Sequence, residues 1–106
     1  MKTEKLENFK GGWFIGNFSP TLLKTRSFEI AVKSYNAGDV EKSHVHKKAT
    51  EYTLVLNGVA MFNDKPISGG TIVILEPGEW NQFKAITDVT TVVIKTPSAK
   101  NDKYTE

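Results

Sequence analysis

The sequence predicts an all-β domain in which short antiparallel strands fold into a barrel or sandwich. Three observations lead to this fold class. Apolar and polar residues alternate, or apolar residues run without interruption, over short stretches of chain. Clusters of glycine, proline, asparagine and aspartate separate these stretches at regular intervals. No segment carries the apolar period of an amphipathic helix.

The first half of the chain predicts a strand followed by a hairpin. Residues 28–33 alternate in the manner of a half-buried strand, and the turn residues Ala37-Gly38-Asp39 end that segment. Residues 50–56 are rich in Thr, Tyr, Leu and Val, which predicts another strand. Asn57-Gly58 then predicts a type I′ hairpin, because both central residues of that turn take a positive φ. Residues 59–62 are expected to be its return strand.

The second half of the chain predicts three more strands. Residues 71–75 are a continuous apolar run, which favours a strand buried in the core. Residues 80–86 and 89–96 are expected to pair with each other across a turn at Thr87-Asp88. Pro97 ends the last strand, because proline has no N–H group to donate to a ladder.

The chain length predicts a single domain over residues 1–106, with a core at about residues 10–97 and loose ends. The polar tail from residue 98 onward is expected to be loose or to lie against a neighbouring subunit. A domain of this size has much surface for its volume, so association into a homodimer is expected to help it.

The charge balance argues against nucleic acid and anionic membranes as partners. The chain has 14 basic and 12 acidic residues, and its net charge is +2. Arg26 is the only arginine, whereas surfaces that read phosphates and bases favour the bidentate guanidinium. The chain has no cysteine, no apolar run of membrane-spanning length and no apolar leader, which indicates a reduced, cytoplasmic protein.

The only two histidines lie two positions apart, in His44-Val45-His46. Residues i and i+2 of a strand point to the same face, so both imidazoles are expected to project together. Residues 47–50 are short enough for a hairpin loop, after which Glu51 opens the adjacent strand and returns to the same face. Two imidazoles and one carboxylate on neighbouring strands make a three-ligand face for a divalent metal.

The spacing of five residues resembles the first motif of the cupin superfamily. Gly38, His44, His46, Glu51 and Gly58 match that motif at every spacing. The resemblance implies a single-domain cupin-type double-stranded β-helix, or jelly-roll, barrel. It also implies that the two histidines and the glutamate bind a metal, that the first glycine shapes the entry turn, and that the second makes the hairpin.

The second cupin motif is matched only in part, by Gly70, Pro77-Gly78 and the strand that starts at Trp80. The position of the family's third histidine is Asn81 here, and the family's usual asparagine four places later is Ala85. An amide oxygen can ligate a hard cation but is a poorer ligand than imidazole for transition metals.

The resemblance therefore implies a divalent metal cofactor with His44, His46, Glu51 and Asn81 as candidate ligands, or water in place of the amide. Iron, manganese, nickel and zinc are not distinguished. The two histidines and the glutamate are also the candidate catalytic groups. The expected function is to bind or act on a small polar or carbohydrate-like molecule, and the resemblance also implies a homodimer.

Two alternatives stay open. His44-Val45-His46-Lys47 and Lys103-Tyr104 also resemble the dTDP-sugar ketoisomerase branch of the cupins, in which a histidine would abstract a proton without a metal. Asn81 at the third histidine position favours this alternative, because proton transfer needs no full ligand set. The other alternative is a cupin that binds its ligand without catalysis.

Other side chains are weaker candidates for the pocket. Lys47 and Lys48 are expected to flank its mouth, as a solvated loop or as a guide for an anionic substrate. Trp13, Phe14 and Phe18 form an aromatic cluster, which is interpreted as core packing or a dimer contact.

Overall fold

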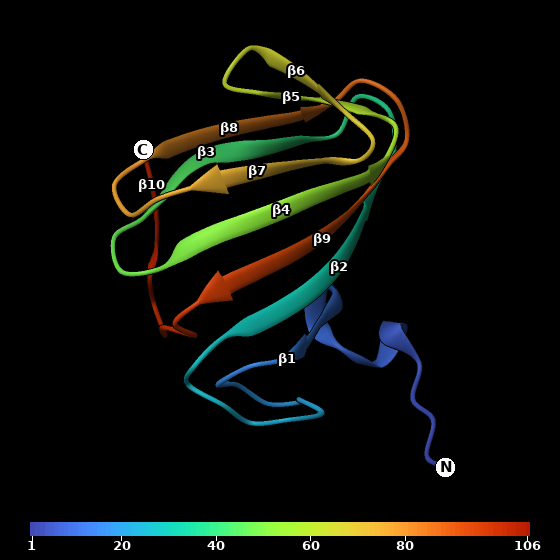
Figure 1. Cartoon of the computed structure of the whole chain (residues 1–106), viewed down its shortest axis with the longest axis vertical. Helices are drawn as coiled ribbons and strands as arrows, with labels where there is room; N and C mark the ends of the chain where they lie inside the picture. Colours follow the sequence, from blue (N-terminus) through green and yellow to red (C-terminus); the bar gives the residue numbers. More distant parts are fainter.

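Ten strands form two five-stranded sheets that face each other (Figure 1). The computed structural model describes all residues, 1–106. Sheet A contains, in spatial order, β1 (Trp13–Ile15), β2 (Glu29–Tyr35), β9 (Val89–Thr96), β4 (Thr50–Asn57) and β7 (Thr71–Leu75). Sheet B contains β10 (Lys103–Thr105), β3 (Val40–His46), β8 (Trp80–Ala85), β5 (Val59–Phe62) and β6 (Lys65–Ser68). Every neighbouring pair is antiparallel.

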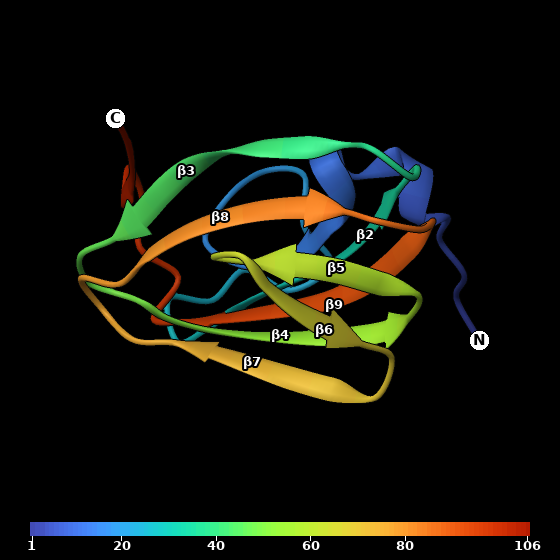
Figure 2. The ribbon, with the colours of Figure 1, turned by 90° about the horizontal axis from the view of Figure 1, so that it is seen from above.

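Most successive strands lie in opposite sheets, which is the connectivity of a jelly roll. Figure 2 shows β3 and β8 on one side of the molecule and β4 and β7 on the other. The prediction of an all-β jelly roll is therefore confirmed. No strand of sheet A pairs with a strand of sheet B, so hydrogen bonds do not close the two sheets into a continuous barrel.

Helical structure is limited to two 3₁₀ turns near the start, η1 (Leu6–Asn8) and η2 (Lys10–Gly12). No helix is long and apolar enough to cross a membrane.

The predicted hairpin at Asn57-Gly58 is wrong. These residues carry the chain from β4 in sheet A to β5 in sheet B, and those two strands do not pair. Of the two residues only Gly58 has a positive φ, at +83°. A Cβ at Gly58 would lie 2.2 Å from the backbone oxygen of Asp88, so glycine permits a close crossing of two chain segments here.

The tight hairpin lies one connection later, at Asn63-Asp64 between β5 and β6. Both residues have a positive φ, 50° and 65°, as a type I′ turn requires. Asparagine and aspartate are the residues that accept this conformation most readily after glycine. The two strands then pair from Phe62 opposite Lys65 to Val59 opposite Ser68.

Two further strand predictions are corrected. The strands predicted as the last pair do not meet, since β8 lies between β3 and β5 while β9 lies between β2 and β4. The apolar run of β7 is not buried but forms an edge of sheet A. Its side chains Ile72 and Ile74 are 58% and 54% exposed. Continuous apolarity at β7 therefore reflects an apolar outer face and not a strand enclosed on both sides.

The apolar core fills one end of the space between the sheets. Its buried members are Val55, Ala60, Phe62, Phe83, Ala85 and Val89. The rings of Phe62 and Phe83 pack edge-on with their centroids 5.2 Å apart, which is a favourable aromatic geometry. Further along the same strands the inward positions become polar, so the core holds the sheets together at one end and leaves a site at the other.

The C-terminal tail is ordered against sheet B, which corrects the expectation of a loose end. Its strand β10 pairs with β3 and sets Lys103 opposite His46 and Thr105 opposite His44. Asp102, just before β10, is buried. The tail therefore covers the edge of the strand that carries both histidines (Figure 1).

Candidate metal centre

Both histidines lie at the end of β3 and point between the sheets. His44 and His46 are each only 5% exposed, and both line one cavity, as their spacing on a strand predicts, while Val45 between them is buried but does not line it. Their rings lie 5.2 Å apart between centroids, at an interplanar angle of 74°. The two imidazoles therefore share one face of sheet B, in agreement with the expectation from their spacing.

Hydrogen bonds to backbone carbonyls define which nitrogen of each imidazole is free. The Nδ1 of His46 lies 2.9 Å from the carbonyl oxygen of Asp102, and the Nδ1 of His44 lies 3.2 Å from that of Lys42. A carbonyl oxygen only accepts hydrogen bonds, so each Nδ1 carries the proton and donates. Each Nε2 is then the unprotonated nitrogen of the neutral ring, which is the form that binds metals.

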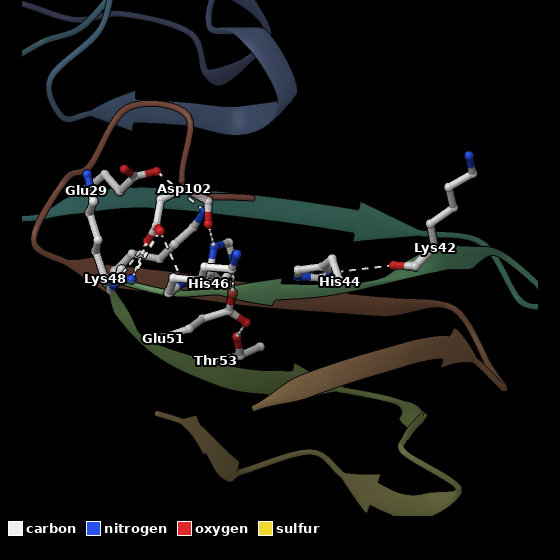
Figure 3. A network of polar contacts seen from close by, with 11 residues as sticks. Glu29, Lys42, His44, His46, Lys48, Glu51, Thr53 and Asp102 are labelled. Carbon is white, nitrogen blue, oxygen red and sulfur yellow. Dashed lines mark hydrogen bonds and ion pairs between the residues drawn. The ribbon is translucent and has the colours of Figure 1, made fainter. Parts of the chain in front are cut away.

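Glu51 approaches the histidines from the opposite sheet. Sequence reasoning placed it on a strand adjacent to β3, but β4 belongs to sheet A and faces β3 across the sandwich (Figure 3). The loop after His46 is therefore a crossover, not a hairpin. Glu51 Oε1 lies 3.3 Å from His46 Nε2, and Glu51 Oε2 accepts a 2.8 Å hydrogen bond from Thr53 Oγ1.

Burial and neighbouring groups shift the pKa values of this site. Burial raises the pKa of Glu51, but the His46 imidazole and the Thr53 hydroxyl outweigh burial and hold that pKa below its ordinary value. Burial lowers the pKa of His44, against the Lys42 carbonyl, which raises it. At neutral pH the centre therefore presents a carboxylate and a neutral His44 imidazole.

Asp102 closes the crossover loop that joins the two sheets. Its carboxylate accepts hydrogen bonds from the backbone N–H groups of Lys47, Lys48 and Ala49, at 2.9–3.1 Å. Its own carbonyl accepts from His46, so one residue holds both the loop and the imidazole (Figure 3). Burial raises the pKa of Asp102, but these three donors outweigh it and keep the pKa low.

Asn81 lies beside the centre on β8, directly opposite His44 in the ladder. Its side chain is buried and its Oδ1 has no hydrogen-bond partner. A buried amide oxygen without a partner costs free energy, which a cation or a ligand donor would recover. The neighbouring Gln82 points outward and donates to the Glu41 carbonyl at 2.9 Å, as the alternation of the strand predicts.

The donor set fits a divalent metal. One donor atom from each of His44, His46 and Glu51 lies within 4.8 Å of the other two. His46 Nε2 faces the Glu51 carboxylate at 3.3 Å and has no hydrogen-bond partner. In a neutral ring whose proton is on Nδ1, two acceptors confront each other there. A cation between them resolves this conflict, and ligands bound about 2.0–2.2 Å from one tetrahedral ion lie roughly 3.3–3.5 Å apart.

The cavity beside the centre is lined by charged residues that sequence reasoning missed. It has a volume of about 100 Å³, and its lining includes Lys33, Lys95, Lys103, Glu41 and Trp13. The signal for the first two lies in strand phase, since Lys33 follows the buried Ala31 by two positions and Lys95 continues the buried positions of β9.

Lys47 and Lys48 do not line that cavity, which corrects the expectation that they flank its mouth. Both side chains are exposed, and the Lys47 ammonium lies 4.1 Å from the centroid of the Tyr104 ring. Trp13 belongs to the cavity wall, although it also meets Phe18 edge-on with ring centroids 6.5 Å apart.

No protein-family model and no curated protein matches this chain. Solved structures do resemble it. An uncharacterised conserved protein with a double-stranded β-helix domain from Klebsiella pneumoniae superposes with a TM-score of 0.73 at 17% identity, over 98% of this chain and 90% of that one.

Two further structures carry functional names. KdgF from Halomonas sp. is similar with a TM-score of 0.65 at 15% identity, over 73% of this chain and 74% of that one. A sugar phosphate isomerase from a cupin superfamily, from Silicibacter pomeroyi, is similar with a TM-score of 0.59 at 22% identity, over 66% of this chain and 50% of that one. At these identities the likeness establishes the fold.

Proposed function

We propose that this chain, which has the double-stranded β-helix fold of the cupins, is a divalent-metal protein that binds and acts on a small polar molecule. His44, His46 and Glu51 hold the metal, and Asn81 or water completes its coordination. The observation that carries the proposal is the contact of a buried His46 Nε2, which has no hydrogen-bond partner, with the Glu51 carboxylate at 3.3 Å.

A bound divalent metal supplies Lewis acidity, which polarises a carbonyl or carboxylate oxygen of the ligand. The protein groups around it do the positioning. Hydrogen bonds to the Asp102 and Lys42 carbonyls orient the two imidazoles, and the Thr53 hydroxyl orients the carboxylate. The small, partly buried cavity limits how much water reaches the bound molecule.

A second candidate function is acid–base catalysis without a metal. A proton on His46 Nε2 satisfies the same contact to Glu51 as a cation does, and the pair then resembles the histidine and carboxylate of a proton-transfer site. The name of the Silicibacter neighbour, a sugar phosphate isomerase, agrees with this chemistry. The cavity of about 100 Å³ is well below the roughly 300–1,000 Å³ of typical ligand pockets, which disfavours a nucleotide sugar.

The first test is elemental analysis of protein purified without chelator and without a metal-affinity column, with His46→Ala as control. The proposal expects near-stoichiometric iron, manganese, nickel or zinc that is lost in the variant. The variant is expected to remain folded, because the core lies at the other end of the sheets.

Metal-free protein that also fails to take up added Zn²⁺ or Mn²⁺ would contradict the metal proposal. In that case turnover of small keto sugars, abolished by His46→Ala, would support the acid–base candidate. Saturable ligand binding without turnover would leave a binding protein.

We also propose that the protein is a homodimer that associates through the outer face of sheet A. The outward side chains of its central and edge strands are apolar: Tyr52, Leu54, Leu56, Ile72, Ile74, Val92 and Ile94. We call this set the apolar face of sheet A. It contains no charged residue, so a matching apolar surface, such as the same face of a second copy, is its natural partner.

A further inference from the structure

Three lysines from three different strands converge on the cavity beside the candidate metal centre. Lys33 lies on β2, Lys95 on β9 and Lys103 on β10, and all three line the cavity. Lys33 and Lys95 are half-buried at inward strand positions, where lysine is rare because its ammonium loses hydration, and the exposed Lys103 reaches the same cavity from an edge strand. The presence of three lysines at one cavity therefore needs a chemical explanation.

Only one of the three lysines forms an ion pair with a carboxylate of the protein. Lys95 forms an ion pair with Glu29 at 3.7 Å, whereas Lys33 and Lys103 form none. Glu51 is occupied by the metal centre and by Thr53. Glu41 also lines the cavity, but it forms no ion pair with Lys33 or Lys103, so two of the three ammonium groups have no carboxylate in direct contact.

Lys95 and Lys103 are close enough to Lys33 for their charges to act on it. Burial lowers the pKa of Lys33, Glu41 and Glu51 raise it, and the positive charges of Lys103 and Lys95 lower it. Such mutual repulsion is relieved when an anion lies among the three cations.

Trp13 holds two of these cations without using their hydrogen bonds. The ammonium of Lys95 lies 4.7 Å from its ring centroid and that of Lys33 lies 5.5 Å from it. Cation–π attraction acts on the charge, so contact with Trp13 leaves the N–H donors of Lys33 available for an anion, while Lys95 shares its ammonium with Glu29. Trp13 therefore serves as a platform on which two donor groups are positioned together.

We propose that Lys33, Lys95 and Lys103 form an anion subsite, and that the ligand of this protein is a small organic acid. Its carboxylate lies at the lysines, and a second oxygen faces His44, His46 and Glu51. The cavity volume of about 100 Å³ limits the ligand to a short carbon chain. The inference rests on the proposed function in one respect, which is that the metal centre binds the second oxygen of the ligand.

The test is isothermal titration calorimetry of chelator-treated and Zn²⁺-loaded protein with malonate, its neutral diamide malonamide, and inorganic phosphate. Malonate is expected to bind at least about tenfold more tightly than malonamide in both forms, because only malonate carries charge for the lysines. Phosphate is expected to bind more weakly than malonate. Equal affinity for the diamide, or tighter phosphate binding, overturns the organic-acid assignment.

Variants locate the subsite. Lys33→Gln and Lys103→Gln are each expected to weaken malonate about tenfold. Lys84→Gln, an equal charge change on the exposed face of β8, is expected to leave malonate affinity unchanged. Equal losses in all three variants overturn the proposal, because they indicate only a general charge effect. Lys103 lies on an edge strand, so its variant keeps the test open if Lys33→Gln fails to fold.

Titration of the same proteins with Zn²⁺ tests the metal proposal separately. If the protein binds Zn²⁺ but binds malonate and malonamide equally well, the anion subsite is contradicted and the metal proposal stands. If the protein takes up no metal but binds malonate in a way that depends on the lysines, the metal proposal is contradicted and the anion subsite is supported.

Discussion

At the scale of single residues, Asp102 connects the tail, the crossover loop and His46. Its carboxylate accepts three backbone N–H groups and its carbonyl accepts from the His46 ring. The sequence around the crossover loop does not predict these contacts, because Asp102 lies more than fifty positions from its hydrogen-bond partners in the loop. Asp102 is therefore a positioning residue for the proposed metal centre.

Asp102→Ala is expected to lower the free energy of unfolding by about 2–3 kcal/mol, because loop donors lose a charged acceptor. Zn²⁺ affinity is expected to fall about 10–100-fold, because the His46 ring loses its orientation. Urea denaturation and competition with a chromogenic chelator measure the two effects. Glu76→Ala, which removes an exposed acid in a turn, is the control. A destabilised variant with unchanged Zn²⁺ affinity would show that Asp102 supports the fold alone.

Asn81 is the residue at which this chain departs from the three-histidine pattern that the resemblance implies. Asn81→His is expected to tighten Zn²⁺ binding by at least about tenfold, because imidazole is a better ligand than an amide for this metal and His44 lies directly opposite. The same chelator competition measures it. Asn81→Leu removes the unpartnered buried oxygen and is the comparison. If the histidine variant binds Zn²⁺ no more tightly than the leucine variant, position 81 does not face the metal.

At the scale of elements, the crossing at Gly58 depends on a missing side chain. Gly58→Val is expected to destabilise the fold by more than about 2 kcal/mol, because valine tolerates a φ of +83° poorly and its Cβ would meet the Asp88 carbonyl at 2.2 Å. Thermal unfolding measures the loss. Gly78→Val is the matched control, since it has a similar φ of +91° but open space around its Cβ. If both variants lose the same stability, the positive φ alone explains the effect and the close contact with Asp88 does not contribute.

Strand alternation in the sequence predicted which side chains point inward but not which sheet carries them. His44, His46 and Asn81 take the inward positions that their phase requires. Glu51 also points inward, but it reaches the histidines across the sandwich because β3 and β4 belong to different sheets. Alternation determines a face, whereas the choice of partner strand depends on long-range packing that local patterns do not contain.

Turn chemistry was informative in a similarly limited way. Asn57-Gly58 and Asn63-Asp64 both reverse the chain, and only the second joins paired strands. The lysines of the cavity were missed because a charged residue in a strand is normally read as solvent-facing. Phase with buried neighbours is the signal that identifies Lys33 and Lys95, whereas β10 is exposed throughout and gives no such signal for Lys103.

At the scale of the whole molecule, the two sheets differ in how they meet solvent. The outer ladder of sheet A sets Tyr52 between Ile74 and Ile94, and Leu54 between Ile72 and Val92. A contiguous apolar surface of this kind is unusual on a monomer and common at subunit contacts. The edge strand β7 contributes Ile72 and Ile74 to this face.

The wild-type protein is therefore expected to sediment as a dimer, at twice the chain mass of 11.8 kDa. Ile74→Glu is expected to shift it to a monomer, because a buried carboxylate without a partner at the centre of an apolar interface is costly, while in the monomer the side chain is 54% exposed. Ile86→Glu is the control, since Ile86 is 46% exposed but lies outside the apolar face of sheet A. Sedimentation velocity separates the outcomes. A monomeric wild type, or a dimer that survives Ile74→Glu, would show that this face is not the interface. A monomeric Ile74→Glu that still binds Zn²⁺ would show that each protomer carries a complete metal centre.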